Sequence, residues 1–111
     1  MVQMKMIQAI IRVEKTEEVS EALLIAGFPA MTKVDVYGRG KQRGLQVGTV
    51  FYDELPKTLL IIVAEEENVE AVLDIILTVA KTSDSGNYGD GRVFVSEVGE
   101  AYTISTKKAE L

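Results

Sequence analysis

The pattern of apolar and polar side chains predicts four strands along the chain. The segment from Met4 to Val13 carries aliphatic residues at every second position from residue 7, and Met31 to Val36 also alternates before a glycine-rich stretch, Gly38 to Gly48. The run from Thr58 to Ala64 is apolar throughout, too short for a helix and rich in β-branched residues, so we expect a central strand there. A further short strand is expected from Arg92 to Ser96.

Two intervening segments have apolar residues at helical spacing. We expect Thr16 to cap the first helix and Gly27 to end it, and Asn68 to cap a second helix that ends near Thr82. The apolar stripes of the two helices are expected to comprise Val19, Ala22, Leu23 and Ala26, and then Val69, Val72, Leu73, Ile76, Val79 and Ala80.

The order strand, helix, strand, strand, helix, strand predicts an α+β fold. We expect one domain, residues 1–111, built as a ferredoxin-like βαββαβ sandwich with an antiparallel sheet, two helices on one face and a long loop between the second and third strands. Both faces of the segment from Leu59 to Val63 are apolar, although the helices cover only one. We therefore predict self-association through the sheet, as a cyclic homo-oligomer.

Composition removes several kinds of chemistry. The 111 residues include no cysteine and no histidine, which excludes disulfides, Cys/His zinc sites, thiol nucleophiles and imidazole bases. The net charge of −5 disfavours binding to nucleic acid or to anionic lipid. No apolar run approaches the ~20 residues needed to span a bilayer, so we expect a cytoplasmic protein without a membrane span.

Two loops concentrate glycine and charge. In the first, three cations are interleaved with glycines, an arrangement that suits a polyanion and equally fits a solvated hairpin loop. These residues are Gly38, Arg39, Gly40, Lys41, Arg43 and Gly44. The second loop, Gly89-Asp90-Gly91-Arg92, taken alone predicts a tight turn leading into a strand. The acidic clusters lie at helix starts, where carboxylates offset the helix dipole, so we interpret them as structural and expect no enzyme activity.

Taken together, the two loops resemble those of the PII family of nitrogen signal-transduction proteins. The resemblance rests on three ordered motifs: Gly40-Lys41-Gln42-Arg43-Gly44 at the start of the family's T-loop, Leu55-Pro56-Lys57 at its end, and Gly89-Asp90-Gly91-Arg92-Val93-Phe94-Val95 in its B-loop. The resemblance implies a homotrimer of ferredoxin-like subunits whose sheets face inward. It also implies intersubunit clefts that bind ATP or ADP.

The resemblance also implies residue roles. Nucleotide would be bound by Gly40, Lys41, Gln42, Gly89, Asp90, Gly91 and Arg92. The effector 2-oxoglutarate would be bound by Gln42 and Lys57, with Gln42 ligating a Mg²⁺ ion shared with the nucleotide, since an amide oxygen suits this hard cation. The T-loop residues expected to meet a target protein are Arg39, Arg43, Leu45, Val47, Phe51 and Tyr52.

Short loops of the GRGKQRG and YDELPKT pattern resemble most the archaeal and anaerobe branch that is encoded beside nitrogenase genes and inhibits nitrogenase. A nitrogenase component, or another protein of nitrogen metabolism, is therefore the expected target. Thr103 and Ser105 stand where the family usually has two arginines that face the phosphates. Losing two such hydrogen bonds to a charged group would weaken nucleotide binding by ~100-fold or more unless Lys107 and Lys108 compensate.

Other interpretations remain open at this stage. One is a divergent PII-like trimer that has lost or altered nucleotide binding and acts as an interaction protein, and mixed oligomers with a paralogue are a further alternative. An acylphosphatase-like enzyme fits less well, because its phosphate loop follows the first strand and ends in arginine, whereas the similar stretch here follows the second strand and ends in Tyr52. An RNA-binding module of this topology would need exposed aromatics on its central strands, which carry aliphatics instead.

Overall fold

The four-stranded sheet of the computed structural model has the strand order β2-β5-β1-β6, and all its neighbouring strands are antiparallel. The structure describes residues 3–39, 45–47, 50–52 and 54–111. The elements are β1 (Met4–Arg12), the 3₁₀ turn η1 (Val13–Lys15), α1 (Thr16–Ile25), β2 (Thr32–Gly38), β3 (Leu45–Val47), β4 (Val50–Tyr52), β5 (Leu55–Glu65), α2 (Glu66–Val79), β6 (Gly91–Val98), β7 (Tyr102–Thr103) and β8 (Lys108–Ala109). The predicted α+β, ferredoxin-like fold is confirmed.

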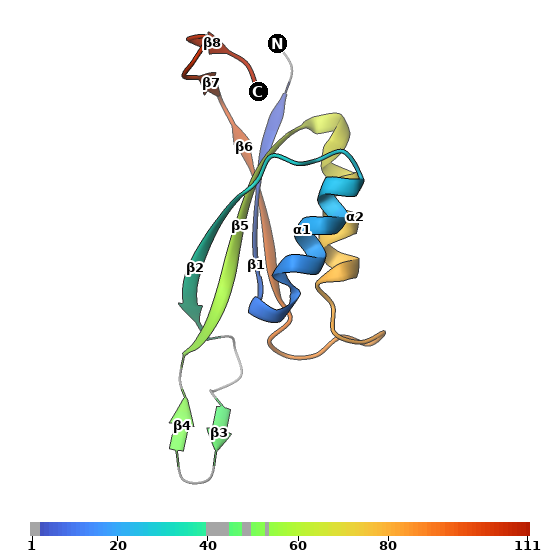
Figure 1. Ribbon diagram of the computed structural model, residues 1–111, viewed down its shortest axis with the longest axis vertical. Helices are drawn as coiled ribbons and strands as arrows, with labels where there is room; N and C mark the ends of the chain where they lie inside the picture. The colour runs from blue at the N-terminus through green and yellow to red at the C-terminus, as the bar shows by residue number, and fades with distance from the viewer. Residues whose placement is uncertain (1–2, 40–44, 48–49, 53) are drawn as a thin grey trace.

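Both helices lie on the same face of the sheet (Figure 1). The core forms between them and the two inner strands, where Ile7 pairs with Ile62 and Ala9 pairs with Leu60 across β1 and β5. The helices add fully buried aliphatic side chains, namely Val19, Leu23, Val72 and Ile76. Burying each such side chain contributes roughly 1.5–3 kcal/mol, so this layer stabilises the domain.

The helix boundaries differ from the sequence-based expectation at both N-termini. Thr16 is the first residue of α1, and its hydroxyl hydrogen-bonds the Thr58 hydroxyl at 2.8 Å. The second helix begins at Glu66, before the expected cap Asn68, and ends at Val79, before Thr82. The prediction for the end of α1 is confirmed: Gly27 has φ +94°, and the Phe28 amide donates to the Leu23 carbonyl at 2.9 Å.

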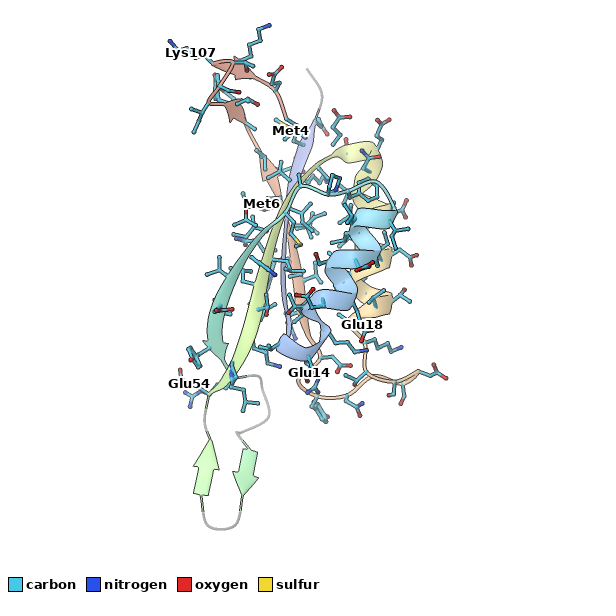
Figure 2. The ribbon with its side chains drawn as sticks, viewed as in Figure 1. Met4, Met6, Glu14, Glu18, Glu54 and Lys107 are labelled. Atoms are coloured by element: carbon cyan, nitrogen blue, oxygen red, sulfur yellow. The ribbon has the colours of Figure 1, made fainter. Side chains whose placement is uncertain are left out.

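The long connection between β2 and β5 contains β3 and β4, two paired strands that the sequence pattern did not predict (Figure 1). The second hairpin, β7–β8, follows β6 at the other end of the molecule. In Figure 2, Lys107 marks the turn of β7–β8, and Glu54, just before β5, marks the opposite end of the sheet, from which β3–β4 extends. Neither described helix has the length and apolar composition to cross a bilayer.

The face of the sheet away from the helices carries many apolar side chains. We call it the open face; it bears, among others, Met6, Ile10, Leu59, Ile61, Val63 and Phe94. The side chains of Met6, Leu59 and Ile61 are half-buried, whereas Phe94 is 49% exposed. An apolar surface of this kind is typical of a protein interface. Self-association through the open face stays a prediction.

Candidate functional site

A cavity of about 530 Å³ lies at the end of the sheet from which the β3–β4 hairpin extends. It is lined by parts of four elements and the loop before β6: Ile10, Gly38, Arg39, Lys57, Asn87, Tyr88, Gly89, Asp90, Gly91, Arg92 and Phe94. The antiparallel register brings these strand ends together. It pairs Arg12, at the end of β1, with Lys57, near the start of β5, and it pairs Ile10 with Arg92. The volume falls in the range usual for small-molecule sites.

Two glycines let the loop before β6 approach the sheet. Gly89 and Gly91 have φ values of +92° and +114°, which side-chain-bearing residues rarely adopt. A β-carbon at Gly91 would lie 1.8 Å from the Ile10 carbonyl oxygen, and one at Gly89 would lie 3.1 Å from Arg12 Nη2. Glycine is therefore required at Gly91 for the loop to enter β6 as it does.

The Asp90 carboxylate organises this loop. Oδ1 accepts hydrogen bonds from the Thr82 hydroxyl at 2.7 Å and from Arg12 Nε at 3.0 Å. Oδ2 accepts from the Asn87 amide at 2.9 Å and the Thr82 amide at 3.2 Å. Burial alone would raise the pKa of Asp90, but these donors outweigh it and hold the pKa well below its usual range. The carboxylate is thus ionised and engaged with four donors from within the chain.

Two cations from the sheet hold the main chain of the same loop. Arg12 Nη2 donates to the Tyr88 carbonyl at 2.8 Å, and Lys57 Nζ donates to the Gly89 carbonyl. Burial, followed by repulsion from the Arg12 guanidinium, lowers the pKa of Lys57. The two cations are cross-strand neighbours, so they meet the loop side by side.

The cavity is suited to an anionic ligand. Three cations line it, Arg39, Lys57 and Arg92, whereas Asp90 is the sole acidic residue among its described lining residues. Because Asp90 is already neutralised by Arg12 at 3.0 Å, the cationic side chains dominate the local charge. Guanidinium groups and glycine-rich backbone together favour phosphate or carboxylate groups.

The structure brings together part of the predicted site. Arg39, Lys57 and the loop Gly89-Asp90-Gly91-Arg92 line one cavity. The predicted residues Gly40, Lys41, Gln42 and Arg43 lie outside the described residues. Leu45 and Val47 form the ends of β3, and Phe51 and Tyr52 belong to β4.

Thr103 and Ser105 lie far from this cavity within one chain. They belong to the segment of β7 and its turn, at the end of the sheet opposite the cavity (Figures 1 and 2). Thr103 is half-buried and its hydroxyl donates to the Glu110 carbonyl at 3.4 Å. A contribution of this segment to the cavity would therefore have to come from another copy of the chain.

Sequence reasoning missed several residues at the site. Arg12 was expected only as part of the strand from Met4 to Val13, and no role at the site was expected for Tyr88 or Phe94. One signal was present: Arg12 is a charge at the end of an otherwise largely apolar strand. Its partner Asp90 is 78 positions away, and this pairing follows only from the strand register.

Comparison with known proteins identifies the family. The model of the nitrogen regulatory protein P-II family matches residues 4–108. The chain belongs to this family. The family is described as nitrogen regulatory, and the match confirms the resemblance drawn from the three motifs.

Curated relatives add a link to nitrogen fixation. The chain is 49% identical over 108 residues to "Nitrogen fixation nifHD region GlnB-like protein 1" of Methanothermobacter marburgensis. It is also 49% identical over 108 residues to the protein of the same description from Methanococcus maripaludis. Each alignment covers 97% of this chain and 100% of the relative. It is 43% identical to "Nitrogen regulatory protein P-II 2" of Methanothermobacter thermautotrophicus, covering 96% of this chain and 93% of that protein. These names match the branch that the loop pattern indicated.

A solved P-II structure supports the fold. The crystal structure of Arabidopsis thaliana PII bound to citrate has a TM-score of 0.78 and 28% sequence identity to this chain. The alignment covers 99% of this chain and 88% of that one. Both the sheet and its two covering helices thus have a P-II counterpart.

Proposed function

We propose that this P-II protein senses ATP or ADP together with 2-oxoglutarate and controls a target protein through its T-loop, which connects β2 to β5. One observation carries the proposal: Lys57, Arg39 and the loop Gly89–Arg92 line one cationic cavity, although they are separated along the sequence. The resemblance implies ligand contacts for Lys57 and for this loop, and a target contact for Arg39. That a related PII structure is described as bound to citrate, a carboxylate, is consistent with an anionic ligand.

In this proposal each described residue has a role that its chemistry supports. Arg92 and the backbone at Gly89 and Gly91 face the phosphates, and Lys57 pairs with a carboxylate of 2-oxoglutarate. Lys57 would exchange the Gly89 carbonyl for that carboxylate, a stronger acceptor. Gly40 and Lys41 would complete the phosphate site, and Gln42 would supply an oxygen to Mg²⁺, which when bound neutralises phosphate charge.

The assembly proposed is a homotrimer formed through the open face. Packing copies around a threefold axis would cover the apolar side chains of this face. It would also give the segment of Thr103 and Ser105 a neighbouring subunit to contact, since it projects beyond the end of the sheet opposite the cavity. A mixed trimer with a paralogue would cover the same apolar face.

The target proposed is a nitrogenase component or another protein of nitrogen metabolism. Support comes from the relatives whose names refer to the nifHD nitrogen fixation region. The contacts would be made by Arg39, Arg43, Leu45, Val47, Phe51 and Tyr52. The position of β3–β4, extending away from the sheet, is compatible with such a role (Figure 1).

A second candidate is an interaction protein that keeps the trimer but binds nucleotide weakly or not at all. The observation that favours it is the neutral pair Thr103 and Ser105, with the Thr103 hydroxyl engaged by its own hairpin. Both candidates predict association, and they differ only in ligand binding.

Isothermal titration separates the two candidates. ATP and ADP are titrated with Mg²⁺, with and without 2-oxoglutarate, into the wild-type protein, an Arg92→Ala variant and a Lys33→Ala control. Lys33 is a cation of β2 outside the described lining of the cavity, with Glu17 3.9 Å away. We expect 2-oxoglutarate to strengthen ATP binding, and Arg92→Ala to weaken it by about 10–100-fold, the equivalent of about 1.5–3 kcal/mol. Absence of heat for every combination would overturn ligand sensing and favour the second candidate.

A further inference from the structure

The end of α1 exposes large apolar side chains on the helix side of the molecule. Leu24 is 58% exposed and Ile25 is 79% exposed, both in the last turn of the helix. The loop that follows adds smaller exposed apolar residues, and we call the whole surface the α1-end patch: Leu24, Ile25, Ala26, Pro29 and Ala30. No charged residue lies between Glu21 and Lys33 in the sequence. An uncharged apolar surface of this extent is typical of an interaction site.

The backbone fixes the shape of the α1-end patch. The Phe28 amide donates to the Leu23 carbonyl at 2.9 Å, and the Gly27 amide donates to the Leu24 carbonyl at 3.1 Å, which together form a Schellman motif. Phe28 is half-buried and packs against the core, so it anchors the loop from beneath. A surface that is ordered before binding loses less conformational entropy when its partner binds. The patch is therefore preorganised for binding.

The charge around the α1-end patch is negative. Glu21 is exposed and precedes Leu24 by three positions and Ile25 by four, which places it beside them on the helix surface. The last turn of α1 contains no basic residue, so no cation from within this turn offsets the partial negative charge of its terminal carbonyls. α2 begins at the same end of the helix layer (Figure 1), where Glu67 and Glu70 are exposed. A cationic partner would complement this surface.

The position of the α1-end patch separates it from the surfaces already described. It belongs to the helix layer, whereas the open face lies on the other side of the sheet (Figure 1). None of its residues is among the described residues that line the cationic cavity. A second copy of the chain is a poor occupant, because two such patches in contact would bring Glu21 close to Glu21 and one helix C-terminus close to another.

We propose that the α1-end patch binds a partner protein that presents apolar side chains flanked by lysine or arginine. The apolar side chains cover Leu24 and Ile25, and the cations meet Glu21 and the last carbonyls of α1. This surface would add a second protein contact to the one proposed for the T-loop. It requires neither nucleotide nor 2-oxoglutarate, so it can be tested apart from the proposed function.

The probe is a stapled helical peptide with leucine on one face and lysine along both borders of that face, because an amphipathic helix is a common ligand of apolar surfaces. A second peptide carries glutamate in place of each lysine. Fluorescence anisotropy gives the dissociation constant for the full-length protein, and NMR shifts of the backbone amides locate the binding site. Vesicles of phosphatidylcholine and phosphatidylglycerol test a lipid surface as the alternative occupant.

Three variants are compared with the wild type: Leu24→Ser/Ile25→Ser, Glu21→Gln and Leu77→Ser. Leu77 is the matched control, because it is 57% exposed on α2 and lies outside the α1-end patch. We expect the lysine peptide to shift the amides of residues 21–31 and to bind the double variant about tenfold more weakly or worse. Glu21→Gln should weaken binding roughly threefold at low salt, and Leu77→Ser by less than about twofold. Unchanged amide shifts in β1 and β5 will show that each variant is folded.

Several results would overturn the proposal. No binding of the lysine peptide, or equal binding to the wild type and the double variant, would show that the α1-end patch is not a docking surface. Equal affinity for the glutamate peptide would refute the cationic character of the partner. Vesicle binding that is lost in the double variant would assign the patch to a lipid surface instead. None of these results bears on ATP binding, which is measured separately.

Discussion

Replacing Gly91 by alanine tests the closest backbone contact at the site. Gly91 begins β6 and pairs with Ile11, and its φ of +114° lies in the region that favours glycine. A β-carbon there would lie 1.8 Å from the Ile10 carbonyl oxygen and 3.2 Å from the Ile11 α-carbon. Both neighbours are main-chain atoms, so no side-chain rotation can relieve the overlap.

The expected cost of Gly91→Ala follows from these numbers. Real β-carbons keep at least 3.0 Å from other heavy atoms, so the start of β6 must move by roughly 1 Å or more. A residue with a side chain held at this φ costs about 1–3 kcal/mol, and a strand hydrogen bond lost by the shift adds about 0.5–1.5 kcal/mol. We therefore expect a loss of about 3 kcal/mol in the free energy of unfolding, which lowers the Tm by about 12 °C at ~4 °C per kcal/mol.

The measurement is thermal unfolding followed by circular dichroism, at one protein concentration because the proposed association would make the Tm concentration-dependent. Gly99→Ala is the control, since no heavy atom lies within 4 Å of the β-carbon position there. Its effect should stay within about 0.5 kcal/mol. Equal destabilisation by the two substitutions would refute the argument that the approach of Gly91 to Ile10 requires glycine.

Three further predictions concern stability. The pKa of Asp90 is lowered in the folded state, so its contribution to stability is complete above its ordinary pKa of 3.8 and is lost as the pH falls below that value. Urea unfolding between pH 5 and 2 should therefore show a weaker pH dependence in Asp90→Asn than in the wild type. Thr58→Val leaves the buried Thr16 hydroxyl only the Arg12 carbonyl, at 3.5 Å, and should cost about 1–3 kcal/mol in urea unfolding, with a smaller further loss when Thr16→Val is added. Gly27→Ala places a side chain at φ +94° in open space and should cost about 1 kcal/mol by thermal unfolding.

The sheet and the helices could be predicted because the spacing of apolar residues along each segment indicates which of its faces is buried. Val69, Val72 and Ile76 fall on the predicted stripe and are buried, and the strands expected from Met4 and from Thr58 are present as β1 and β5. These segments have one face in the core, so the spacing of their apolar residues follows the geometry of the element. The fold was accordingly available from the sequence.

The errors at the helix starts arose where a side chain or amide bonds a residue far away in the sequence and not a local one. Thr16 was expected to cap α1, but its hydroxyl pairs with Thr58, 42 positions away. Asn68 has the residue type of a cap, yet α2 already begins at Glu66, whose amide donates to the Gln3 carbonyl at 2.9 Å. The paired strands β3 and β4 were missed because the glycine-rich stretch around them shows no sustained alternation.

The site was predictable in its residue types but not in its connections. The glycines and cations of the two loops indicated an anion site, and the structure places Lys57 and Arg92 in one cavity. Asp90, predicted to contact nucleotide, is instead engaged with four donors of its own chain, and its contact with nucleotide stays a prediction. Whether a side chain binds the ligand or holds the loop depends on its neighbours in space. Those neighbours cannot be read from the order of residues along the sequence.

The cavity and the open face are continuous, so the proposed function would couple ligand binding to the proposed assembly. Ile10 and Phe94 belong to the open face and also line the cavity. A copy packed on the open face in the proposed trimer would therefore lie beside the ligand and exclude water from it. A ligand that binds the assembled form more tightly than the separate subunit must stabilise the assembly by the same free energy. The cationic cavity and the apolar sheet, which the sequence presents as two separate features, are then parts of one equilibrium.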